Sequence, residues 1–233
     1  MSRYPGAVWR DVGAPQHYSN GTMHSHTGIV LHVNDAQSDD LYGWITGDNG
    51  MSCHFQVNKA GKVYQYIDTA YSSWCQKDGN DDYLSIESQG LASELATDAQ
   101  RNAIAGILAW AKQTHDIPLQ LAEIPGQRGF GWHGMGAAHG FDWGHPDCPG
   151  VRRDQRSSML VLANQILSGS GTGEFVMDAE AKAAFAAAHN DMVVLLHGGT
   201  QKDANGNTII THPNNIDAIV ERLRKIEYKL DIS

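Results

Sequence analysis

The sequence predicts an α/β fold, with a central mixed β-sheet flanked by helices and a small helical region at the C-terminal end. Three observations support this fold class. Short apolar runs rich in β-branched or aromatic residues have the length of strands, longer stretches repeat apolar residues at helical spacing, and the two kinds of segment alternate. Strands that alternate with helices typically form one sheet covered by helices.

Four segments are expected to supply strands. Residues 27–34 (TGIVLHVN) predict a short buried strand, because apolar β-branched residues dominate and polar residues bound the run. Alternating residues at 53–58 and 62–68 predict a hairpin, since Gly61 between them accepts the positive φ of a tight connection. Residues 83–87 (YLSIE) predict a further strand, whose final glutamate stands where strand ends commonly face a cleft.

Two helices are expected in the same region. The sequence TDAQ at 97–100 is a capping box, in which the threonine accepts from a first-turn amide and the glutamine reaches back. Apolar residues then recur at helical spacing to about His115. The same criterion predicts a second helix over roughly 154–167.

The clearest change in composition is the run SGSGTG at 168–173, which is typical of a flexible linker. A larger domain at 1–167 is therefore expected to precede a helical region at 174–233. In that region an Ala-rich helix at 174–197 should lead through a turn-rich connection to a closing helix at 216–230. Apolar residues of the closing helix step by three and four: Ile216, Ile219, Leu223, Ile226 and Leu230.

Such a narrow apolar seam is typical of a coiled coil, so a homo-oligomer joined through 216–230 is expected. Because two heptads are short for a coiled coil, the alternative is a helix that folds back on the 174–197 helix.

Composition excludes some partners. Seventeen basic against twenty-six acidic residues give a net charge of −9, which argues against nucleic acid held by phosphate contacts. No run of about eighteen apolar residues occurs, so no membrane partner is expected, and MSRYPGAVWRDVG lacks the apolar core of a signal peptide. Three cysteines, Cys53, Cys75 and Cys148, are an odd number, so at least one should be a free thiol or a thiolate ligand.

Residues 131–150 (GWHGMGAAHGFDWGHPDCPG) hold three histidines and a cysteine. Zinc prefers imidazole nitrogen and thiolate sulfur, and a catalytic zinc site keeps three protein ligands and one open position. The cluster by itself leaves two interpretations open: a metal site, or solvated imidazoles on a Gly-rich loop.

Several segments together resemble the type 2 N-acetylmuramoyl-L-alanine amidases, the family that also contains peptidoglycan-recognition proteins and many phage endolysins. They are IVLHVN, SCHFQVNKAGKVYQYID, SSW, LSIESQG, and GFGWH followed by HPDCPG. Their order and spacing agree with the family over about residues 27–155, and the resemblance implies the family's fold.

Carried over position by position, the resemblance implies that His32, His133 and Cys148 bind Zn2+. Two neutral imidazoles and one thiolate leave the metal one net positive charge and an open position, which suits activation of water near neutral pH. His139 is the alternative to His133, because it lies nine residues before Cys148 and some family members have short spacings. His133 is preferred because it follows GFGW as the family's histidine follows its strand.

The resemblance also implies the catalytic residues. Glu87 matches the glutamate that acts on the attacking water in bacterial members of the family, whereas the tyrosine that other members use is replaced here by Cys53. His145 is expected to stabilise the oxyanion, although the matching family position is Pro146. His54 is expected to form part of the cleft wall or to support the metal ligands from behind, and not to bind the metal itself.

One segment departs from the family. Where the family often has Trp-His-Ala-Gly, this chain has Trp74, Cys75, Gln76 and Lys77. Trp74 is expected to line the groove for glycan and stem peptide, because a large flat side chain suits such packing. Cys75 stands where the family often has its histidine.

The resemblance implies hydrolysis of the amide bond between N-acetylmuramic acid and L-alanine in bacterial peptidoglycan. It suggests a phage endolysin, made in the host cytoplasm without a signal peptide and acting on the cell wall after release. The alternative is a non-catalytic peptidoglycan-binding module, but such relatives usually lose the cysteine that Cys148 matches. Residues 174–233 offer few aromatic side chains for sugar stacking, so oligomerisation is preferred there over cell-wall binding.

Overall fold

The computed structural model describes residues 2–13, 19, 21–47, 50–169, 201–202 and 208–209. The chain divides into two compact units, residues 1–172 and 173–233, and each is described by itself. None of the described helices has the length and apolar character that crossing a lipid bilayer requires.

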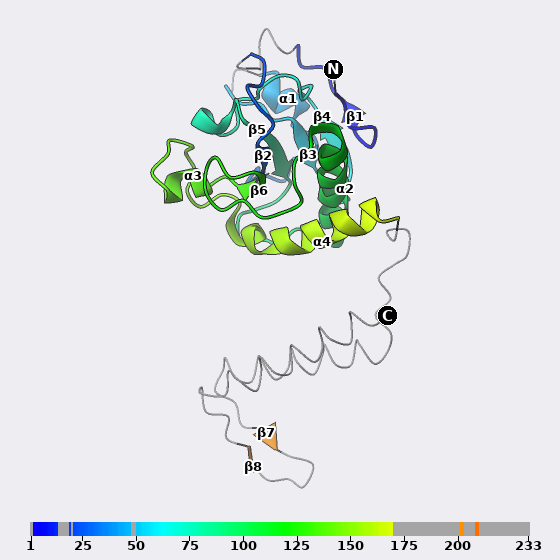
Figure 1. The fold of residues 1–233 in the computed structure, drawn as a ribbon, viewed down its shortest axis with the longest axis vertical. Helices are drawn as coiled ribbons and strands as arrows, with labels where there is room; N and C mark the ends of the chain where they lie inside the picture. The colour runs from blue at the N-terminus through cyan, green and yellow to red at the C-terminus, as the bar shows by residue number, and fades with distance from the viewer. Residues whose placement is uncertain are drawn as a thin grey trace. The chain divides into compact units, whose positions relative to one another are not determined.

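The first unit is built on a mixed sheet of six strands (Figure 1). In chain order they are β1 (Val8–Trp9), β2 (Gly28–Val33), β3 (Phe55–Val57), β4 (Val63–Gln65), β5 (Tyr83–Ser88) and β6 (Gly129–Trp132). Their order across the sheet is β1-β4-β3-β5-β2-β6, with β3 and β4 antiparallel and every other pair parallel. The α/β fold and the four predicted strands are confirmed, although the hairpin strands are shorter than their alternating runs.

Two long helices, α2 (Asp98–His115) and α4 (Arg156–Leu167), lie side by side against the sheet (Figure 1). The capping box of α2 is present, because Thr97 Oγ1 accepts from Gln100 N and Gln100 Oε1 accepts from Thr97 N. Two shorter helical turns join strands, α1 (Tyr42–Ile45) and a 3₁₀ turn at Lys77–Gly79, and a third, α3 (Met135–Ala138), follows β6. The predicted helix at 154–167 begins as a second 3₁₀ turn at Gly150–Gln155 and becomes α-helical at Arg156.

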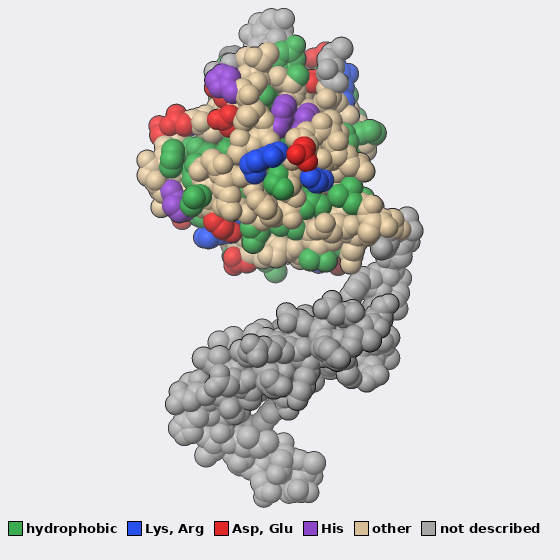
Figure 2. Space-filling model, viewed as in Figure 1, with side chains coloured by type: hydrophobic (Ala, Val, Ile, Leu, Met, Phe, Trp, Pro, Cys, Tyr) green, Lys and Arg blue, Asp and Glu red, His purple; other side chains and the backbone are tan. Residues whose placement is uncertain are grey.

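The two faces of the sheet differ because successive side chains of a strand point to opposite sides. One face packs its apolar side chains against α2 and α4, and Leu31 of β2, Ile86 of β5 and Ile104 of α2 belong to the same core cluster. The opposite face carries His32 and Glu87, the neighbours of these two residues along β2 and β5. On the side of the molecule drawn in Figure 2, acidic and basic side chains are interspersed among apolar ones.

Little of the second unit is described. Gln201–Lys202 (β7) and Thr208–Ile209 (β8) pair antiparallel, inside the segment that the sequence predicts to be a turn-rich connection. The helices expected at 174–197 and 216–230 lie outside the described residues, as does most of the linker at 168–173. The oligomer expected through 216–230 stays a prediction.

Candidate metal centre

A cleft of about 600 Å³ opens where β2, β5 and β6 reach their carboxyl ends. Ligand sites of open α/β sheets commonly lie at this edge. Histidine, thiol, carboxylate and aromatic side chains line it, among them His32, Trp44, Trp74, Cys75, Glu87, His133, Trp143, His145 and Cys148.

Strand register brings three predicted site residues together. His32 pairs with Glu87 in the parallel register of β2 and β5, so both side chains lie on the same face of the sheet. On the other side of β2, Leu31 pairs with Trp132, and the N–H of His133 donates to the carbonyl of Leu31 at 3.2 Å. His133 therefore lies beside His32, and their ring centroids are 4.3 Å apart.

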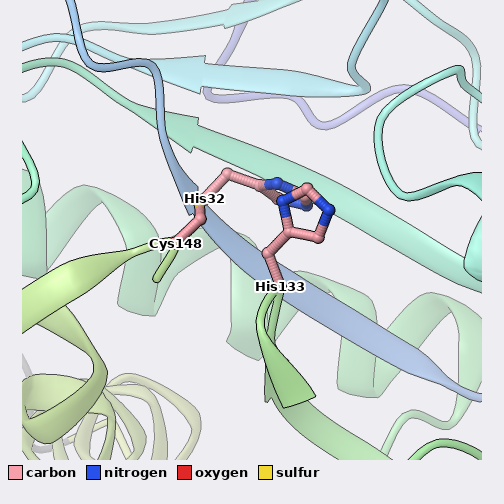
Figure 3. Close-up of side chains that lie close together, drawn as sticks. All are labelled: His32, His133 and Cys148. Atoms are coloured by element: carbon pink, nitrogen blue, oxygen red, sulfur yellow. The ribbon is translucent and has the colours of Figure 1, made fainter. Parts of the chain in front are cut away.

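Cys148 reaches the same place from the loop before the Gly150–Gln155 turn. Gly134 N donates to the carbonyl of Cys148 at 2.8 Å, and Val33 N donates to its sulfur at 3.4 Å. Figure 3 shows the rings of His32 and His133 side by side, with Cys148 next to them. One donor atom from each of these three residues lies within 4.8 Å of the other two.

The structure separates the two alternatives for the second histidine. His133 is buried, whereas His139 is exposed at the end of α3, and its Nδ1 lies 2.9 Å from the carbonyl of Met135. Of these two described residues, His133 lines the cleft and His139 does not.

Hydrogen bonds determine which ring nitrogen of each histidine is unprotonated and can bind a metal ion. His133 Nε2 lies 2.7 Å from the carbonyl of Trp143, and because a carbonyl only accepts, this nitrogen carries the proton. The side-chain amide of Gln76 donates to the carbonyls of Tyr83 and Gly79, so its oxygen faces His32 Nε2 at 3.0 Å. Nε2 of His32 is then also the protonated nitrogen. Both rings therefore present an unprotonated Nδ1, as metal-bound histidines with a fixed second nitrogen do.

Burial favours the neutral form of each group. It lowers the pKa of His32 well below its ordinary value, with the nearby His133 adding to the effect, and it lowers the pKa of His133 to about 4. Both imidazoles are thus neutral at pH 7, which is the form that binds metals. Burial, together with the charge of Glu87, raises the pKa of the Cys148 thiol, so binding a cation would release its proton.

Glu87 is buried next to these groups. Its Oε1 accepts from Cys75 Sγ at 3.5 Å and lies 3.9 Å from His32 Nδ1, while its Oε2 has no hydrogen-bond partner among the described residues. Burial raises the pKa of this carboxyl to about 7, opposed by the Cys75 hydrogen bond and the charge of Arg152. Two imidazoles, a thiol and a carboxylate oxygen without a partner fit the donors that zinc prefers.

His145 and His54 stand apart from this group. His145 is exposed on the rim of the cleft, with its ring centroid 5.4 Å from that of His133. His54 is buried between Ser85 Oγ at 3.0 Å and the carbonyl of Tyr71 at 2.8 Å. It is not among the described residues that line the cleft, so it does not form the cleft wall, and its support of the site from behind stays a prediction.

The segment that departs from the family pattern supplies two groups that the sequence did not single out. Gln76 is fully buried and orients His32, and Cys75 contacts both Glu87 and His32. The only signal in the sequence was the departure itself, because neither burial nor the hydrogen-bond pattern can be read from two residues. Trp74, 36% exposed, lies on the cleft as expected.

Comparisons with known proteins identify the family of the chain. A family model described as N-acetylmuramoyl-L-alanine amidase matches residues 16–151, more than half of the chain. No curated protein matches.

One solved structure shares the fold at a TM-score above 0.5, and others are less similar. The hydrolase AmiA of Staphylococcus aureus, solved with its ligand, gives a TM-score of 0.57 at 20% identity, over 73% of this chain and 89% of that one. A mutant endolysin from Bacillus subtilis gives a TM-score of 0.49 at 17% identity, over 72% of this chain and 99% of that one. The peptidoglycan-recognition protein SA of Drosophila gives 0.49 at 14% identity, over 64% and 90%.

Proposed function

The chain belongs to the N-acetylmuramoyl-L-alanine amidase family, and on that premise we propose that it cuts peptidoglycan between N-acetylmuramic acid and L-alanine by a zinc-dependent hydrolysis. The observation that carries the proposal is the convergence of His32, His133 and Cys148 beside the buried carboxylate of Glu87. Non-catalytic relatives usually lack the cysteine, so the donor set favours an enzyme over a binding module.

Zinc would be held by Nδ1 of His32, Nδ1 of His133 and the sulfur of Cys148. When bound, the ion supplies a Lewis acid that activates water and the scissile carbonyl at neutral pH. Gln76 and the carbonyl of Trp143 fix the two rings, so the ligands need little reorganisation.

Glu87 is proposed as the general base and acid. Its unpartnered Oε2 accepts a proton from the attacking water and returns it to the departing amine of L-alanine. A carboxyl with a pKa raised by burial suits both transfers near neutral pH, because it holds and gives up the proton with similar ease.

The rim residues complete the proposal. His145 would donate to the oxygen that becomes negative during attack, a role that its exposed position beside His133 allows. Trp74 and Trp44, 36% and 47% exposed, would pack against the glycan or the stem peptide.

The test is release of stem peptides from purified peptidoglycan. The protein should expose new N-terminal alanine, a chelator should abolish this release, and added zinc should restore it. Release that continues undiminished after metal removal would contradict the zinc mechanism. Binding to peptidoglycan without any release, with zinc present, would instead identify a binding module.

We also propose that the biological role is lysis of a bacterial host by a phage. The support is the CPG ending after a Gly-aromatic-His element, which is the feature that most resembles endolysins. Purified protein added to permeabilised bacteria should lower their turbidity, and the Glu87→Gln variant should not. A protein that releases peptides from isolated wall but leaves cells intact would argue for another role.

A further inference from the structure

A second set of metal donors lies in the same cleft and shares one residue with the first. His32, Cys75 and Glu87 each offer one ligand atom, and these atoms lie within 4.8 Å of one another. Cys75 Sγ is 3.7 Å from His32 Nδ1 and 3.5 Å from Glu87 Oε1, and Glu87 Oε1 is 3.9 Å from His32 Nδ1. Cys75 has no part in the function proposed above.

These separations are close to those that a metal ion imposes. Tetrahedral zinc with bonds of about 2.0–2.3 Å to nitrogen, oxygen and sulfur holds its ligand atoms about 3.3–3.6 Å apart. The three donors therefore need to move only a few tenths of an ångström to surround an ion.

Two further observations point to a ligand. Glu87 is only 4% exposed, and its Oε2 has no hydrogen-bond partner among the described residues, which is costly for a buried carboxylate. The amide of Gln76 holds the proton of His32 on Nε2, so an unprotonated Nδ1 faces Cys75 and Glu87. Nitrogen, sulfur and carboxylate oxygen are all accepted zinc donors.

We propose that His32, Cys75 and Glu87 form a second, alternative position for a thiophilic divalent cation such as zinc or cobalt. The two positions exclude each other, because both use Nδ1 of His32 and one nitrogen lone pair binds one ion. Binding at the second position releases the thiol proton of Cys75 to solvent, together with the proton of Glu87 where that carboxyl is protonated.

The consequence for catalysis rests on the proposed function. An ion at the second position takes Glu87 as a ligand, so the carboxylate is no longer free to accept a proton from water. Loss of Cys148 should then leave a protein that still binds one metal ion but has no activity. The metal content of a variant that lacks Cys148 would therefore not show whether Cys148 belongs to the catalytic site.

Cobalt alone, added to the full-length Cys148→Ser variant, tests the second position. Thiolate bound to Co2+ gives an intense near-ultraviolet charge-transfer absorption, which imidazole and carboxylate ligands do not. C148S should bind one Co2+ and keep this absorption, since Cys75 still supplies a thiolate. The double variant C75S/C148S should lose it, and E87Q/C148S should bind Co2+ at least about tenfold more weakly.

Cys53 is the matched control, because it is a buried thiol near Glu87 that belongs to neither donor set. C53A/C148S should keep the absorption. Cys75→Ala in place of serine, with melting curves for each variant, separates loss of a ligand from loss of the fold. The proposal is overturned if C148S shows no thiolate absorption, or if folded C75S/C148S keeps that absorption unchanged. Either result would mean that the three residues form only a hydrogen-bonded cluster. No peptidoglycan is used, so an inactive wild-type protein would refute the proposed function without affecting this result.

Discussion

The two faces of the sheet use the same strands for different purposes. Along β5, Leu84 and Ile86 point to the helices and are fully buried in the apolar core, whereas Ser85 and Glu87 point to the opposite side. Both pairs are buried, but apolar burial stabilises the fold and burial of a carboxyl opposes it. Neighbouring residues of one strand should therefore separate stability from activity.

The two faces also differ in the interactions that hold their side chains in place. The helix-covered face depends on many contacts of similar kind, shared among β2, β5, α2 and α4. The cleft face depends on single hydrogen bonds, such as that between His32 and Gln76. A substitution on the first face should reduce the free energy of unfolding, and one on the second should change metal affinity or turnover.

The largest effect is expected for Glu87→Gln. This change keeps the shape of the side chain but removes the proton acceptor, so kcat should fall by about 10²–10⁴-fold. Stem-peptide release from purified peptidoglycan measures kcat, and circular dichroism reports whether the fold is retained. Turnover within a factor of three of wild type would remove Glu87 from the mechanism.

Leu84→Ala, three residues earlier on the same strand, should show the opposite behaviour. It leaves a cavity among the core residues between β5 and the helices, which costs about 2–5 kcal/mol of stability. Urea unfolding measures the loss in the free energy of unfolding. Turnover per folded molecule should stay near the wild-type value. A variant of normal stability and low activity would show that the two faces are coupled.

In the metal-free protein, the buried carboxyl of Glu87 on the cleft face should make the free energy of unfolding depend on pH. Burial raises the pKa of Glu87 to about 7 in the folded state, above its ordinary value of 4.5. The folded protein then binds the proton more tightly than the unfolded chain, so stability is greatest below pH 4.5 and is lost as the pH rises through 7.

Relative to Glu87→Gln, the metal-free wild-type protein should lose about 3 kcal/mol between pH 4.5 and pH 8. Chemical unfolding of both proteins at several pH values in the presence of a chelator measures this difference. The other titrating groups are common to the two proteins and cancel. Parallel stability curves would mean that the carboxyl is solvated.

The fold could be predicted from the sequence because its signals are local. Alternation and helical spacing follow from side chains a few residues apart, and the capping box at 97–100 marks the first turn of α2 correctly. The hairpin strands were predicted too long, since alternation continues past the residues that form backbone ladders. The strand pair at 201–202 and 208–209 was missed in a segment rich in turn residues.

The site was only partly predictable. His32, His133, Cys148 and Glu87 were chosen by resemblance, and the parallel register that brings the first two and Glu87 side by side is a long-range property. Gln76 could not be identified, because its importance lies in the direction of one amide. That direction depends on the carbonyls of Tyr83 and Gly79, which the fold brings to it.

The smallest effect expected is that of Gln76→Leu, which removes the bond that keeps the proton of His32 on Nε2. Without it, part of the population should carry the proton on Nδ1 and fail to coordinate, so zinc affinity should fall by about 10–100-fold. Competition with a chromophoric chelator measures the affinity. The ¹⁵N chemical shifts of the His32 ring in the metal-free protein report the tautomer directly.

Gln100→Leu is the matched control for this change. Gln100 is also fully buried, its amide also donates to two carbonyls, those of Val57 and Gln89, and its oxygen also accepts an N–H, that of Thr97. It lies at the start of α2, on the helix-covered side. Both variants should lose comparable stability, but only Gln76→Leu should weaken zinc binding and shift the tautomer of His32. Equal loss of affinity in the two would mean that buried amides support the site only through general stability.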